Sequence, residues 1–148
     1  MGIRRKAREL VLQGMYAWEM NRDRFDSLIE SFSEDLPGDP DTAEFAASLL
    51  RKTVRNQEEL DTDIQSAAQN WDLGRMALID RLILRLALAE LLHFEEIPPK
   101  VTINEAIDLA KKFSTENSGT FVNGILDALY RRYRQENRIR KTGRGLLD

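Results

Sequence analysis

The sequence of 148 residues contains no cysteine, which excludes disulfides, thiolate metal sites and cysteine nucleophiles. It also lacks a long hydrophobic run, because residues 82–92, the longest nearly apolar stretch, are interrupted by Arg85 and Glu90. Such a stretch is too short and too charged to span a bilayer. The N-terminus has no apolar segment followed by small residues, as a secretory signal would have. We therefore expect a cytoplasmic protein without a membrane span.

Signals of catalysis are also scarce. No glycine-rich turn has the spacing of a phosphate loop, and no serine lies in the context of a nucleophile elbow. The single histidine, His93, follows the apolar stretch, where a favourable interaction with a helix dipole is the simplest interpretation. The carboxylate pairs Asp61/Asp63 and Glu95/Glu96 lie in polar segments, whereas a metal or acid–base site needs carboxylates that converge from several elements. We expect neither an enzyme nor a bound metal or cofactor.

Charge is unevenly distributed along the chain. The first eight residues carry four basic side chains and no acidic one, and the last eighteen carry seven basic and two acidic side chains. Residues 9–130 hold eleven basic and twenty-three acidic residues, a net charge of −12, which the overall charge of −3 hides. A basic head and tail indicate that a polyanionic ligand binds at one place on the protein. The acidic body elsewhere keeps the protein in solution, because molecules of like charge repel one another.

Apolar residues recur at helical spacing along most of the chain, and no segment shows the alternation of a strand. The helix predicted at 76–93 is apolar on most of its circumference, so we expect it to be central. About seven helices are predicted in all. Their approximate ranges are 4–20, about ten residues from 25, 41–54, 60–67, 76–93, 102–113 and 118–130.

Two loop segments and a pair of prolines divide these helices. LPGDPD (36–41) and NWDLGR (70–75) are rich in breaking residues, and EIPPK (96–100) ends the central helix because prolines cannot donate to its hydrogen-bond ladder. The pattern predicts an all-α fold, in which a single domain contains two packed helical sub-bundles. The sub-bundles are expected at about residues 1–70 and 71–134, and a basic tail at 135–148.

Three polar residues are expected to cap helices at their N-termini, namely Asp41, Thr102 and Ser118. Thr102 and Glu105 have the spacing of a capping box. Ser118 would follow a short loop, STENSG (114–119). Beyond the last helix the apolar period fades, so the basic tail is expected to fray.

The basic head is the strongest candidate for a binding site. At 100° per residue, Arg5, Leu12 and Tyr16 fall within about forty degrees of one another on the first helix. Guanidinium groups hold phosphates, and an exposed aromatic ring stacks on an unpaired base. This strip favours a nucleic-acid ligand, although four basic residues at an N-terminus also serve solubility alone. The basic residues of the head are Arg4, Arg5, Lys6 and Arg8.

The second half of the chain carries polar residues that a plain core would not need. Phe121 falls in the first turn of the last predicted helix, beside Asn117 and Asn123. Asparagine amides there either cap the helix locally or donate to a ligand at its N-terminus. Three charged residues interrupt the central helix, either as internal ion pairs or as the polar part of a partner interface. They are Asp80, Arg81 and Arg85.

Three segments resemble the NusB family of transcription antitermination factors. VTINEAIDLAKKFSTENSGTFVNGILD (101–127) looks like the family's C-terminal signature, and DRLILRLALAELL (80–92) looks like its central helix. RRKARELVLQGMYAWE (4–19) is similar to its arginine-rich N-terminal helix. The same module occurs at the N-terminus of an rRNA cytosine methyltransferase. No segment that could bind S-adenosylmethionine follows here, which favours the stand-alone factor.

The resemblance implies a factor that binds boxA RNA, a single-stranded element of ribosomal-operon transcripts, together with the ribosomal protein NusE. The complex would assemble on RNA polymerase with other Nus factors and suppress termination, and some members of the family form homodimers. Matched by motif, the implied RNA contacts are Arg4, Arg5, Lys6, Arg8, Tyr16, Asn117, Ser118, Phe121 and Asn123. Asp80, Arg81 and Arg85 resemble the segment with which the family contacts NusE.

Two other interpretations stay open from the sequence. The acidic body and the charged residues of the central helix also suit a helical scaffold that binds only proteins. An RNA-modifying module of the methyltransferase kind is the second, and it requires a cofactor site that the sequence does not display.

Overall fold

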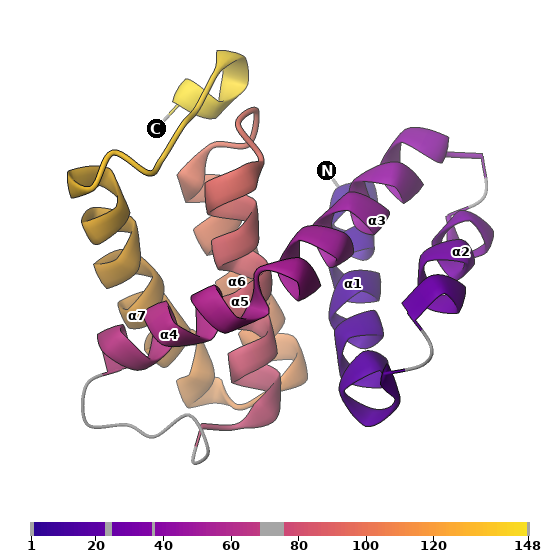
Figure 1. Cartoon of the computed structure of the whole chain (residues 1–148), viewed down its shortest axis with the longest axis horizontal. Helices are drawn as coiled ribbons and strands as arrows, with labels where there is room; N and C mark the ends of the chain where they lie inside the picture. Colours follow the sequence, from indigo (N-terminus) through magenta and orange to yellow (C-terminus); the bar gives the residue numbers. More distant parts are fainter. Residues whose placement is uncertain (1, 23–24, 37, 69–75, 148) are drawn as a thin grey trace. The chain divides into compact units, whose positions relative to one another are not determined.

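A computed structural model describes residues 2–22, 25–36, 38–68 and 76–147 (Figure 1). The described residues form seven α-helices and, near the C-terminus, a 3₁₀ turn, and they contain no strand. The prediction of an all-α fold with about seven helices is therefore confirmed. The α-helices are α1 (Gly2–Met20), α2 (Phe25–Asp35), α3 (Pro40–Arg55), α4 (Gln57–Ala68), α5 (Leu78–His93), α6 (Pro99–Phe113) and α7 (Glu116–Gln135), and the turn η2 spans Gly143–Leu146.

The chain divides into two compact units, Met1–Arg55 and Asn56–Asp148. The sequence placed the division near residue 70, but α4 contacts α5 and α7 and so belongs to the second unit. The reason is the apolar face of α4, where Leu60 and Ile64 are fully buried. The loop predicted at 70–75 lies outside the described residues.

In the first unit, α3 contacts both α1 and α2. Leu49 and Leu50 of α3 are fully buried, and Phe32 of α2 is 2% exposed. The Oδ1 atom of Asp39 accepts a hydrogen bond from the backbone N–H of Thr42 at 3.1 Å, so Asp39, and not Asp41, caps α3. Pro40 can start the helix because the first helical position needs no donor.

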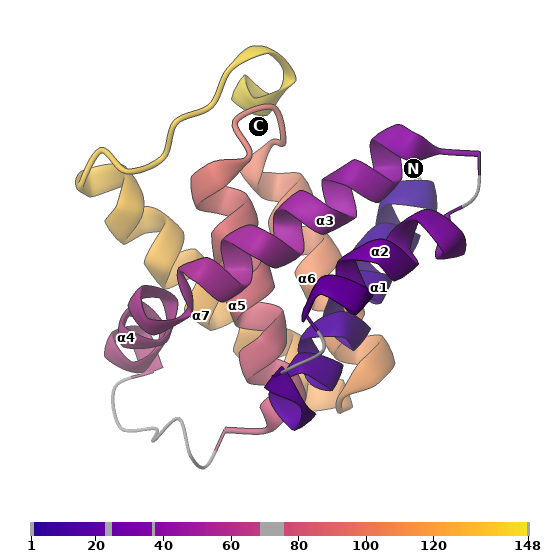
Figure 2. The same ribbon diagram turned by 45° about the vertical axis from the view of Figure 1, so that its right-hand side comes forward.

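In the second unit, α5 is the central helix, as predicted, because it contacts α4, α6 and α7 (Figure 2). Its side chains are buried almost continuously from Leu82 to Leu91. His93 lies in its last turn and is exposed, consistent with the predicted position at a helix C-terminus.

Two predicted caps are wrong in this unit. Helix α6 begins at Pro99, and Thr102 lies inside it, where its hydroxyl donates to the buried carboxylate of Glu90 instead of capping. Helix α7 begins at Glu116 with Thr115 as its N-cap, and Ser118 is the third helical residue. The backbone N–H of Thr115 donates to Ser118 Oγ at 3.3 Å, which completes a capping box. The expected loop at 114–119 is correspondingly shorter.

The expectation of a frayed basic tail is also wrong. Helix α7 ends in a Schellman motif, in which Arg138 N–H donates to Tyr133 O at 2.8 Å and Asn137 N–H donates to Arg134 O at 3.1 Å. Asn137 has a φ of 56°, a conformation that asparagine tolerates better than most residues. The chain then reverses and lies along the second unit, where Thr142 N–H donates to Glu95 O at 3.0 Å.

Candidate nucleic-acid interface

The basic head forms the first turns of α1. The side chains of Arg4, Arg5 and Lys6 are exposed. The guanidinium carbon of Arg4 lies 4.3 Å from the ring centroid of Phe45 on α3, a cation–π contact that restrains the side chain. The head therefore presents cations from a helix and not from a loose arm.

Arg8 differs from the rest of the head because it is only 4% exposed. Its guanidinium carbon lies 5.5 Å from the same Phe45 ring centroid. Arg8 therefore packs beneath the exposed cations of the head, and its contact with RNA stays a prediction.

Tyr16 is 45% exposed on the same helix, as its register predicted. The strip is not continuous, because Leu12 between Arg5 and Tyr16 is only 2% exposed. Tyr16 is therefore exposed for stacking, and it lies nearly three helical turns along α1 from Lys6, the nearest exposed cation.

A second group of predicted residues lies at the start of α7. Asn117 and Asn123 are exposed, and Phe121 is half-buried. Asn104, on α6, is exposed as well. Helix α7 has 20 residues and begins at Glu116, so Asn117 lies in its first turn, where the dipole favours anions. Phe121 and Asn123 are its sixth and eighth residues, so the expected position of Phe121 in the first turn is wrong.

Ser118 belongs to the support of this turn, because it is only 4% exposed. Its hydroxyl donates to Asp80 Oδ2 at 3.0 Å and also lies 3.0 Å from Ser114 Oγ. The carboxylate of Asp80 is buried, and its Oδ1 atom has no hydrogen-bond partner in the part of the chain that the structure describes. Asp80 therefore holds the first turn of α7 from α5.

The partner residues predicted on α5 are mostly internal. Arg85 is buried and forms two hydrogen bonds with Asp61 of α4, Nε to Oδ1 at 2.7 Å and Nη2 to Oδ2 at 2.8 Å. Asp80 is buried as described, and Arg81 is half-buried. Of the two interpretations left open by the sequence, the structure favours an internal ion pair for Arg85, and it buries Asp80 against Ser118, so neither side chain lies on an exposed partner surface.

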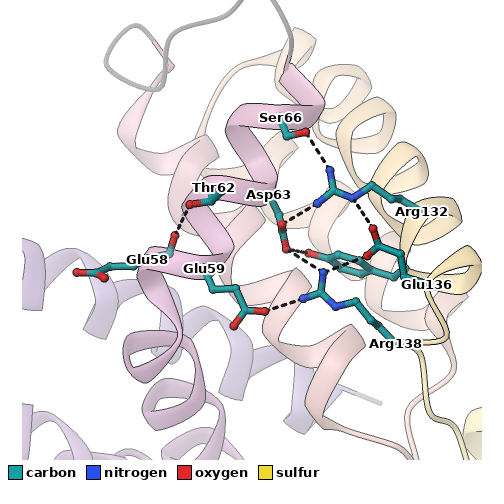
Figure 3. A network of polar contacts seen from close by, with 9 residues as sticks. Glu58, Glu59, Thr62, Asp63, Ser66, Arg132, Glu136 and Arg138 are labelled. Atoms are coloured by element: carbon teal, nitrogen blue, oxygen red, sulfur yellow. Dashed lines mark hydrogen bonds and ion pairs between the residues drawn. The ribbon is translucent and has the colours of Figure 1, made fainter.

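The sequence did not predict a polar cluster around Asp63 (Figure 3). The carboxylate of Asp63 is buried and accepts from Arg132 Nη2 at 2.7 Å, Tyr133 OH at 2.7 Å and Arg138 Nη1 at 3.4 Å. Arg138 also donates to Glu59 Oε1 at 2.7 Å. The pKa of Tyr133 is raised well above its ordinary value, mainly by burial and to a smaller extent by the hydrogen bond to Asp63. The cluster ties α4, α7 and the tail together.

The described ranges contain neither a candidate metal site nor a candidate membrane span. No group of three or more histidine, aspartate or glutamate side chains is placed to hold a metal ion there. None of the helices in those ranges combines the length and the apolar character that crossing a membrane requires.

The comparisons with known proteins decide the family. A model of the NusB family matches residues 5–131. The chain belongs to the NusB family. It is 47% identical over 148 residues to the transcription antitermination protein NusB of Salinibacter ruber, covering 99% of this chain and 92% of that protein. It is 42% identical over 146 residues to the protein of the same name from Chloroherpeton thalassium, covering 98% of this chain and 69% of the relative.

Solved structures of NusB share the fold. T. maritima NusB superposes with a TM-score of 0.78 at 38% identity, over 86% of this chain and 90% of that one. A crystal structure of the antitermination factors NusB and NusE in complex with double-stranded RNA contains a chain with a TM-score of 0.76 at 31% identity, over 90% and 99%. The relatives are transcription antitermination proteins, and the interpretation of this chain as a non-enzymatic factor follows from its family.

Proposed function

We propose that the chain is a transcription antitermination factor that binds single-stranded RNA of the boxA type together with the ribosomal protein NusE. The observation that carries the proposal is the exposed cluster of Arg4, Arg5 and Lys6 on a helix that also exposes Tyr16, in a member of the NusB family. The cations supply affinity for phosphates, and the ring supplies a stacking surface.

The start of α7 supplies a second contact region in this proposal. Asn117 and Asn123 can donate to base edges, and the half-buried Phe121 can stack. Ser118 and Asp80 act as positioning residues that hold this turn. Arg8 plays the same part beneath the head. These assignments rest on exposure and hydrogen bonding.

A related NusB structure indicates NusE as the protein partner in this proposal. The related complex contains NusE and RNA, and this chain covers 99% of the related chain. We infer that NusE binds this chain as well, and that Arg81, the half-buried member of the three charged residues on α5, contributes to this interface. Assembly with RNA polymerase and other Nus factors would follow in the cytoplasm, where the transcript is made.

The test is an RNA titration with three proteins, each with and without NusE. The wild type should bind a boxA-like strand more tightly than a scrambled strand, and NusE should raise that affinity. The variant Arg4→Gln/Arg5→Gln/Lys6→Gln should lose affinity for both strands, because each neutralised phosphate contact is lost. Tyr16→Ala should lose mainly the preference for boxA.

Equal affinity of the wild type for both strands, unaffected by the head variant, would exclude the proposal. A strong complex with NusE in which RNA adds no affinity would favour a scaffold that binds only proteins.

A further inference from the structure

The basic side chains of the C-terminal segment, residues 132–147, fall into two sets. The first set is bonded to the second unit. Arg132 and Arg138 bond to Asp63, and Lys141 Nζ donates to Phe94 O at 2.8 Å. These residues fix the segment to the second unit.

The second set points outward, and its members are Arg134, Arg140 and Arg144. The side chains of Arg140 and Arg144 form no ion pair or hydrogen bond with the described part of the chain. The guanidinium carbon of Arg134 lies 5.7 Å from the ring centroid of Tyr130 and meets no carboxylate in the described ranges. These three arginines therefore face solvent, whereas the other basic side chains of the segment are bonded to the second unit.

The segment that carries them is held in place. Thr142 N–H donates to Glu95 O, and Gly145 is buried directly against the backbone of Glu95 and Glu96, where no side chain would fit. A charged group on an ordered segment loses less conformational entropy on binding than one on a loose tail. Arg140 and Arg144 are four residues apart, so their Cα atoms lie at most about 14 Å from each other.

We propose that Arg134, Arg140 and Arg144 form a second RNA-binding surface, which takes the phosphodiester backbone of nucleotides that flank the boxA-type element. The inference rests on the proposed function. A planar guanidinium without an acidic partner is suited to bidentate hydrogen bonding with a phosphate. The surface lies beyond residues 5–131, the part of the chain that matches the family model.

Charge distribution gives a reason for this placement. The rest of the second unit, residues 56–130, carries thirteen acidic and six basic residues. RNA that runs along this unit is repelled by most of it, so the outward arginines offer a favourable place for the flanking backbone. Because they contact phosphates and not bases, the added affinity should be independent of the flanking sequence.

The experiment compares two RNAs, a boxA-like strand and the same strand extended by flanking nucleotides of arbitrary sequence. The wild type should bind the extended strand more tightly, and the variant Arg140→Gln/Arg144→Gln should lose this gain while binding the short strand normally. Two fewer phosphate contacts should make the slope of log affinity against log salt less steep by about 1.4. Between 50 and 200 mM salt this corresponds to an affinity loss smaller by about sevenfold.

Two control variants separate the surface from general charge. Arg51→Gln/Arg55→Gln removes the same charge from α3, and it should keep the gain from the flanks. Arg140→Lys/Arg144→Lys keeps the charge, and it should keep the salt slope with lower affinity. Thermal melting should show that all variants are folded, because the substituted side chains are wholly or partly exposed.

The outcomes distinguish the two proposals. If the wild type binds the short strand but the flanks add no affinity, or if the α3 control loses the gain equally, the second surface is refuted and the proposed function stands. If the wild type does not bind the short strand at all, both are refuted.

Discussion

Arg85 of α5 and Asp61 of α4 form a two-pronged ion pair, with N–O distances of 2.7 and 2.8 Å. The side chain of Arg85 is 5% exposed and that of Asp61 is 24% exposed. An arginine in the middle of the most apolar helix is therefore neutralised by the neighbouring helix. The pair also explains why α4 belongs to the second unit.

Replacing Asp61 by alanine should destabilise the protein markedly. The change leaves the guanidinium of Arg85 buried without its carboxylate, and loss of one partner of a buried pair costs about 3 kcal/mol. Asp61→Asn, which keeps one acceptor oxygen, should cost less. Urea unfolding measures both, and a loss below about 1 kcal/mol for Asp61→Ala would show that the pair is well solvated.

The hydroxyl of Tyr133 should make stability sensitive to alkaline pH. Burial and Asp63 raise the pKa of Tyr133 in the folded state, whereas the unfolded tyrosine has a pKa of about 10. Above pH 10 the unfolded state therefore loses a proton that the folded state keeps, and the free energy of unfolding falls as pH rises. Tyr133→Phe should lower stability by about 1.5 kcal/mol at neutral pH and remove this dependence.

The measurement is the difference in unfolding free energy between Tyr133→Phe and wild type from pH 8 to 11. Taking a difference matters because burial lowers the pKa of Lys141, which raises stability as pH rises and opposes the tyrosine effect. The difference cancels the contribution of Lys141. Tyr130→Phe on the same helix is the control for loss of a hydroxyl, and equal pH slopes in wild type and Tyr133→Phe would contradict the prediction.

Gly145→Ala should release the C-terminal segment. A Cβ atom at this position would overlap the backbone of Glu95, which cannot move aside as a side chain could. We expect faster hydrogen exchange at Thr142 N–H and a stability loss of about 1–3 kcal/mol. Gly124→Ala is the matched control, because nothing lies within 4 Å of its added Cβ and alanine favours the helix. Unchanged exchange at Thr142 in Gly145→Ala would show that the tail is held elsewhere.

The helices and the exposure of Tyr16 could be predicted because both depend on local periodicity. Helical spacing of apolar residues gave the seven helices, and the register of α1 placed Tyr16 away from its apolar face. The caps failed because several polar residues near each helix start were suitable, and tertiary contacts chose between them. The hydroxyl of Thr102, for example, donates a hydrogen bond to Glu90, a residue twelve positions earlier, and so does not cap a helix.

The tail and the burial of Arg8 could not be predicted for a related reason. A run of basic residues shows charge but not its partners, and the acids that hold Arg132 and Arg138 lie on α4, about seventy positions away in sequence. Arg8 is likewise buried, unlike Arg5, and its guanidinium group lies over the ring of Phe45 on α3, far away in sequence. Pairings across such separations carry no local pattern.

Asn117 and Ser118, adjacent in the first turn of α7, should respond to alanine substitution in opposite ways. Ser118→Ala removes a buried hydroxyl and leaves the Asp80 carboxylate without its donor, so we expect a stability loss of about 2–3 kcal/mol. Asn117→Ala removes an exposed amide and should change stability by less than about 0.5 kcal/mol. Its effect should instead be weaker RNA binding at unchanged salt slope, because an amide neutralises no phosphate. Chemical denaturation and RNA titration of both variants check the pair, and a stable Ser118→Ala protein with normal RNA affinity would remove the positioning role of Asp80 and Ser118.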